Sequence, residues 1–61
     1  MKHIHFTDND EIIETKKAAN MDDAIEKLRR MLIDGFSPDA ERTLRAGGEI
    51  VIGDCETAFI K

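Results

Sequence analysis

Polar and apolar residues alternate along residues 2–17, KHIHFTDNDEIIETKK. Alternation with a period of two is typical of strands that bury one face and expose the other. The pattern breaks at Asp8-Asn9-Asp10, and asparagine and aspartate tolerate the left-handed backbone of tight hairpin turns. These residues therefore predict a β-hairpin whose turn is centred on Asn9 and Asp10.

The register of this first hairpin follows from the position of its turn, because side chains alternate strictly between the two faces of a strand. A turn at that place sets Phe6 opposite Ile13. It also sets Ile4 opposite Thr15, and these four side chains are expected to share the core face. The exposed face is expected to carry the other residues: His3, His5, Thr7, Ile12, Glu14 and Lys16.

Between residues 20 and 34 the apolar residues recur every three or four positions, which is the period of an amphipathic helix. Asn20 is a favourable N-cap, and Asp23 at the third helical position suits the positive end of the helix dipole. Gly35 is predicted to end the helix, because glycine readily takes the left-handed conformation of a C-terminal cap. Phe36 is expected to fold back on the last turn. The apolar stripe of this helix consists of Met21, Ala24, Ile25, Leu28 and Leu32.

A second, shorter helix is predicted in SPDAERTLRAGG, residues 37–48. Ser37 is a good N-cap, and Pro38 suits the first helical position. The two glycines at the end of the segment stop the helix. Leu44 is its only large apolar side chain, with Ala40 and Thr43 as smaller inward candidates. So short a helix is marginal alone and is expected to pack on something else.

The closing segment GGEIVIGDCETAFIK predicts a second hairpin with its turn around Gly53–Glu56. A two-residue turn at Gly53-Asp54 would shift the register and mix the faces, so the register is left with two alternatives. In the favoured register one face carries four bulky side chains: Ile50, Ile52, Thr57 and Phe59. The other face carries three further apolar side chains: Val51, Ala58 and Ile60.

The order of elements is therefore ββααββ, an α+β fold with one main helix and one short helix on an antiparallel sheet of about four strands. The main helix can cover only one face of such a sheet. The other face is expected to present an apolar patch, and such a patch usually marks an interface. There are two alternatives to an interface. The short helix could cover that face of the sheet, or the apolar residues of the face could be scattered singly, as on many protein surfaces. The predicted interface residues are Ile12, Val51, Ala58 and Ile60.

The length of 61 residues gives a single domain, residues 1–61. A chain this short buries only about 60% of its unfolded surface, so its net stability is expected to be small. Small folds gain stability from disulfides, metals or oligomerisation. The single cysteine, Cys55, excludes an internal disulfide. A symmetric homodimer is therefore favoured, because two-fold dimers are the commonest oligomers.

Charge limits the kinds of partner. The chain has 13 acidic and 9 basic residues and a net charge of −4, which disfavours binding to a nucleic-acid backbone. No apolar run approaches the roughly 18 residues of a membrane span, so no membrane partner is expected. The first residues lack the apolar core of a signal peptide, and we expect a cytoplasmic protein.

One basic cluster is a candidate partner-binding site. Acidic residues are interleaved with it, and the chain has no Trp or Tyr on which a base could stack. A solvated helical face with ion pairs is the favoured explanation of the pattern. A nucleic-acid-associated regulator that uses these helices remains an alternative function. The arginines are Arg29, Arg30, Arg42 and Arg45.

No cofactor and no metal site is predicted. His3 and His5 would point the same way from a strand, and a metal-binding protein is a further alternative, but zinc needs at least one more ligand. The TDNDE segment lacks the later ligands and the glycine of a calcium loop. Cys55 lies between two acidic residues, which disfavour the thiolate that a nucleophile requires.

The sequence favours a non-enzymatic protein-interaction module, an adaptor, inhibitor or regulator that acts through its sheet. A chain of 61 residues can hardly enclose a substrate pocket, and no nucleophile–base pair is apparent. An open sheet edge could also add a strand from an unknown protein partner. Proteins of this size and charge are common among bacterial and phage accessory proteins.

Overall fold

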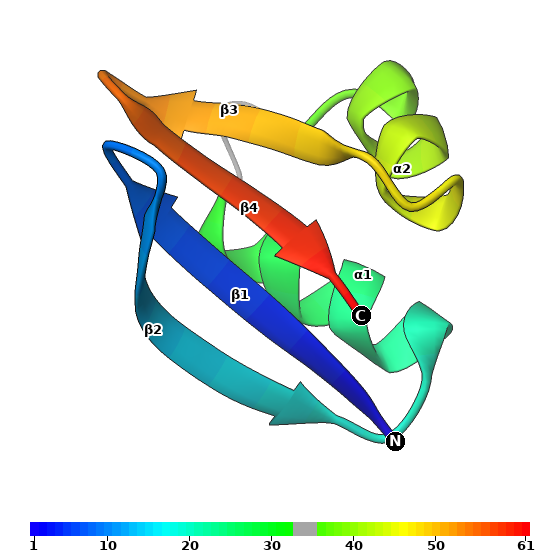
Figure 1. Ribbon diagram of the computed structural model, residues 1–61. Helices are drawn as coiled ribbons and strands as arrows, with labels where there is room; N and C mark the ends of the chain where they lie inside the picture. The colour runs from blue at the N-terminus through cyan, green and yellow to red at the C-terminus, as the bar shows by residue number, and fades with distance from the viewer. Residues whose placement is uncertain (33–35) are drawn as a thin grey trace.

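The computed structural model describes residues 1–32 and 36–61, which form one antiparallel sheet of four strands and two helices. The strands lie in the order β2-β1-β4-β3, so β1 and β4 are central and β2 and β3 are the edges. The predicted α+β fold with the order ββααββ is confirmed (Figure 1). The elements are β1 (Lys2–Asp8), β2 (Glu11–Ala18), α1 (Met21–Met31), α2 (Pro38–Arg45), β3 (Glu49–Gly53) and β4 (Glu56–Ile60).

The first hairpin turns where the sequence predicts. Asn9 and Asp10 have φ angles of 51° and 68°, the left-handed conformation that both residues tolerate. Beyond the turn, however, the register shifts by one residue, because Phe6 pairs with Glu14 and not with Ile13. Ile13 is the extra residue of a β-bulge and is exposed, so its predicted place in the core is wrong.

The same bulge moves Thr15 to the other face of the sheet. Thr15 pairs with His5, and its hydroxyl lies 3.0 Å from His5 Nδ1. The prediction that Thr15 shares the core face with Ile4 is therefore wrong. A shift of one residue moves every following side chain to the opposite face of the sheet. A single bulge therefore changes the face of all the residues that follow it in the strand.

The closing hairpin repeats this arrangement. Gly53 pairs with Glu56 on either side of the turn, as the favoured register requires, but Val51 then pairs with Thr57. Ile52 is the bulge residue, and the faces of β4 are reversed relative to those of β3. The predicted exposure of Ala58 and Ile60 is consequently wrong, since their exposed fractions are 0% and 4%.

Helix α1 begins with reciprocal capping. Asn20 Oδ1 accepts the backbone N–H of Asp23 at 2.8 Å, as the predicted N-cap requires. The carboxylate of Asp23 in turn accepts the N–H of Ala19 at 2.9 Å and lies 3.2 Å from Lys27 Nζ. The predicted end of the helix at Gly35 lies outside the described residues. The buried side chains of α1 belong to the predicted stripe: Ala24, Ile25 and Leu28.

This cap gives the fold a pH dependence that can be measured. The pKa of Asp23 is lowered from its ordinary value of 3.8, mainly by the Ala19 N–H and then by Lys27. A carboxyl group with a lowered pKa in the folded state stabilises the fold above its unfolded pKa, and this contribution is lost as the pH falls through the folded pKa. We therefore expect the urea midpoint to fall as the pH drops below about 4, and to fall less in Asp23→Asn. Equal pH dependence in the two proteins would contradict this role of Asp23.

Helix α2 also begins as predicted. Ser37 Oγ accepts the backbone N–H of Ala40 at 3.1 Å, and Pro38 occupies the first helical position. The helix ends before Gly47, whose φ of 90° suits glycine. Phe36, just before this helix, packs against the core, with its ring 5.5 Å from the Arg29 guanidinium of α1. This position agrees with the predicted fold-back of Phe36.

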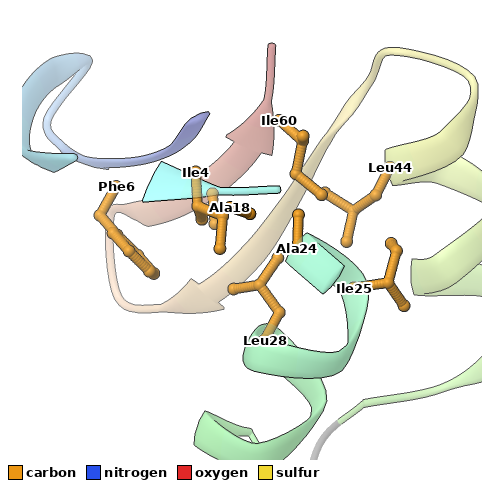
Figure 2. Packing of buried hydrophobic residues seen from close by; sticks show 9 residues of the cluster. Ile4, Phe6, Ala18, Ala24, Ile25, Leu28, Leu44 and Ile60 are labelled. Carbon is orange, nitrogen blue, oxygen red and sulfur yellow. The ribbon is translucent and has the colours of Figure 1, made fainter. Parts of the chain in front are cut away.

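The core lies between the helices and one face of the sheet. In Figure 2 the side chains of Leu44 in α2 and Ile60 in β4 point toward each other, and both belong to the same buried cluster as Ile25 of α1. The short helix therefore packs on the core side, and the alternative in which it covers the other face is wrong. Neither α1 nor α2 is long and apolar enough to cross a membrane. The sheet contributes five residues to the core: Ile4, Phe6, Ala18, Ala58 and Ile60.

Candidate protein-interaction surface

The face of the sheet opposite the helices, here called the open face, carries one row of aromatic and polar side chains. His5 lies at its centre, with its ring 5.0 Å from that of Phe59 and 6.1 Å from that of His3. Because paired residues share a face, the row crosses all four strands. From β2 to β3 it consists of Thr15, His5, Phe59 and Glu49.

A second row on the open face is apolar at its ends and polar in its middle. The Thr57 hydroxyl donates to Glu49 Oε2 at 3.3 Å and is hydrogen-bonded to the hydroxyl of the buried Thr7. At the two ends, Ile12 on β2 and Val51 on β3 are 57% and 78% exposed. The exposed apolar groups of this row therefore lie at the two edges of the sheet and not at its centre.

The four residues predicted as one interface are not brought together. Ile12 and Val51 are exposed on the open face, but on opposite edge strands. Ala58 and Ile60 lie in the core on the other face, because the bulge at Ile52 reverses their direction. No single apolar patch containing all four exists on the described surface of one chain.

The arginine cluster is charge-compensated. Arg29 lies 2.9 Å from Glu26 and 2.6 Å from Glu41, and the latter contact links α1 to α2. Arg45 makes a second link with Asp22 at 2.7 Å, and its pKa is raised by the Asp22 and Glu41 carboxylates. The other two pairs are Arg30 with Glu26 and Arg42 with Asp39. The cluster is thus the ion-paired helical face that the sequence allowed, with each arginine beside a carboxylate.

The two histidines and the cysteine do not form a shared site. His3 and His5 stack on β1, and the described residues include no group of three or more side chains that could hold a metal ion. Cys55 is exposed in the turn between β3 and β4, with a φ of 60°. The described geometry therefore places no third ligand beside the histidine pair.

The two edges of the sheet differ in a way that bears on binding. Natural edge strands are commonly guarded against further pairing by charges and bulges. Both edge strands contain a β-bulge, so the difference between them lies in their charges. Strand β2 carries four charged side chains, and Lys27 also donates to its Lys17 carbonyl at 3.0 Å. Edge strand β3 contains the uncharged run Ile50-Val51-Ile52, with Glu49 as its only charge. In the described parts of the chain, no strand pairs with the outer side of β3.

A groove runs beside the uncharged run of β3. It has a volume of about 670 Å3 and lies where α2, the end of α1 and β3 meet. Met31 contributes an apolar side chain that is 48% exposed, although most methionines in small domains are better covered. Asp39 and Glu49 provide acidic groups among the lining residues. The apolar lining includes Met31, Leu32, Ala40, Ile50, Val51 and Ile52.

No family model, curated protein or solved structure matches this chain. Function must therefore be argued from the surface itself. The sequence predicted that a sheet edge could accept a strand, but it did not indicate which edge. The available signal was the contrast between the charged strand β2 and the uncharged run in β3. No pattern in the sequence predicts the groove, because its walls come from separate parts of the chain.

Proposed function

We propose that this protein is a small adaptor, inhibitor or regulator that binds an extended segment of a polypeptide as an added strand on β3. The observation that carries this proposal is the coincidence of an uncharged stretch of sheet edge with a groove whose lining is partly apolar. Addition of a strand to a sheet edge gains affinity from backbone hydrogen bonds and specificity from pockets for alternate side chains. Edge and groove together supply both requirements.

The direction of the side chains on β3 defines how such a segment would bind. Ile50 and Ile52 face the helices and pack against the core, whereas Val51 faces the other way. Alternate side chains of the added strand would follow the same two directions. Those on the helix side would contact Met31 and Leu32, so apolar residues are favoured there. Those on the other side would lie beside Val51.

The alternatives gain no specific support from the described residues. The arginines that a nucleic-acid-associated regulator would use are paired with carboxylates. The histidine pair has no third ligand among the described side chains. Binding through β3 is therefore favoured over nucleic-acid binding and metal binding.

Two lysine substitutions at matched positions test the proposal. Val51 and Ile12 are exposed apolar residues at opposite ends of one row on the open face. Peptides would be selected from a displayed random library on the natural protein, and their affinities measured by calorimetry. We expect apolar residues at alternate positions, and affinity lowered at least about tenfold by Val51→Lys, because lysine on an edge opposes strand pairing. Ile12→Lys should change the affinity less than about twofold.

The amide NMR spectrum adds a structural readout to the same experiment. Peptide binding should shift the resonances of β3 and of Met31 more than those of β2. A library that yields no binding peptide, at protein concentrations at which the chain is monomeric, would overturn the proposal. So would peptides that lose affinity with Ile12→Lys but keep it with Val51→Lys, since they would bind at the opposite edge.

A further inference from the structure

We propose that the strand accepted by β3 is the β3 strand of a second copy, in a two-fold dimer with one continuous sheet of eight strands. This proposal rests on the proposed function, because it names the occupant of the same edge. Each chain supplies four strands, and β3 lies at the outside of the sheet. Antiparallel pairing of two such edges is the isologous contact that two-fold symmetry requires.

The sequence of β3 is complementary to itself in one antiparallel register. A two-fold axis through Val51 sets this residue opposite Val51 of the second copy. It also sets Ile50 of each copy opposite Ile52 of the other, so the whole apolar run faces itself. Glu49 then lies opposite Gly53, which has no side chain. Like charges directly opposite each other destabilise a sheet, and this register does not place any in that position.

The positions of the helices are compatible with this register. Helix α2 lies beside the start of β3 (Figure 1), so antiparallel pairing places the two copies of α2 at opposite ends of the joined strands. On the helix side, Ile50 and Ile52 of each copy lie toward the groove of the other. The two grooves then meet beneath the joined strands, with Met31 and Leu32 of both copies in their walls.

A stable dimer must bury more accessible surface than strand pairing can supply, so the groove must be part of the interface. A standard interface removes about 800 Å2 from each partner. This is about a fifth of the 4156 Å2 of accessible surface on one chain. Strand β3 has five residues, and the bulge at Ile52 shortens its regular edge, so strand pairing alone is too small. Burial of the exposed Met31 and of the groove walls supplies further apolar area.

Sedimentation equilibrium over a range of concentrations tests this dimer. The natural protein should pass from one chain mass to two as its concentration rises. Val51→Lys should raise the midpoint concentration at least about tenfold, because two lysines would meet near the axis. Met31→Lys is a second variant, outside the sheet, with the same expected direction. Ile12→Lys is the matched control and should leave the midpoint within about twofold.

A mixing experiment tests the two-fold register itself. Val51→Lys and Val51→Glu chains should each remain monomeric, whereas an equimolar mixture should form dimers because opposite charges then meet at the axis. Circular dichroism of every variant confirms that it is folded. Failure of the mixture to associate more strongly than either variant alone would overturn the register through Val51.

The outcomes separate this inference from the proposed function. A natural protein that stays monomeric at all concentrations but binds selected peptides on β3 overturns the dimer and leaves the proposed function standing. A dimer that Ile12→Lys disrupts and Val51→Lys does not also overturn the inference, since it would form through β2. Absence of both dimer and peptide binding overturns both proposals.

Discussion

Replacement of Leu44 by alanine is expected to lower the free energy of unfolding by about 2–5 kcal/mol, the cost of removing a fully buried leucine side chain. Leu44 is completely buried and is the only buried residue of α2. A helix of eight residues is not stable alone in water, so its attachment depends on this contact. Because domains of this size have a total stability of only about 3–5 kcal/mol, the variant should be largely unfolded. Urea unfolding followed by circular dichroism measures the effect.

Arg42→Ala on the same helix is the matched control. Arg42 is exposed and pairs with Asp39, a neighbour one turn away. Surface ion pairs of this kind contribute little, so the loss should stay below about 1 kcal/mol. Leu44→Met, which nearly conserves volume, should recover most of the stability. Equal urea midpoints for Leu44→Ala and the natural protein would show that α2 does not depend on the core.

Ala58→Lys is expected to abolish the folded state, whereas Val51→Lys should fold normally. Ala58 lies in the central strand β4, paired with Phe6 and Ile50, and is fully buried. A lysine there would overfill the core and bury a charge without a partner, and such changes exceed about 4 kcal/mol. At the exposed Val51 the same side chain should cost less than about 0.5 kcal/mol. Dispersion of amide NMR resonances distinguishes a folded from an unfolded chain.

This pair of variants also tests the register of the closing hairpin. In the register predicted from the sequence, Val51 and Ala58 both lie on the exposed face, and both variants would fold. With the bulge at Ile52, the two residues lie on opposite faces, and only Val51→Lys folds. A well-dispersed spectrum of Ala58→Lys would therefore mean that the bulge is absent.

Turns and helix caps could be predicted from the sequence because each depends on the chemistry of a few neighbouring residues. Asn9 and Asp10 adopt left-handed conformations that few other residues accept. Asn20 and Ser37 cap the two helices through side-chain oxygens three residues before the donors. The fold class then follows from the order of these elements.

The two bulges could not be predicted because their extra residues, Ile13 and Ile52, are ordinary strand formers. A glycine follows only the second of them, and the hairpin turn already explains Gly53. A regular strand therefore looks equally good in the sequence. The error affects function directly, since it assigned Ala58 and Ile60 to the surface when they belong to the core.

The candidate site could be predicted only in part, because some of its features depend on spacing along the chain and others depend on how separate segments pack. Exposure of Ile12 and Val51 followed from their positions in the pattern. The ion-paired character of the arginine cluster followed from the acidic residues interleaved with it. The contacts between helices and the groove beside β3 depend on how three separate segments pack, and periodicity along the chain contains no information about that packing.

Pairing of β1 with β4 has a consequence for protein synthesis. These strands begin and end the sheet in chain order, yet they lie side by side, and His3 and Lys61 exchange backbone hydrogen bonds of 3.1 and 2.9 Å (Figure 1). Long-range pairings form slowly, because most of the chain must be in place first. The edge of β1 that pairs with β4 therefore stays unpaired while both helices and β3 are synthesised, and the four-stranded sheet is complete only when residues 56–60 have left the ribosome.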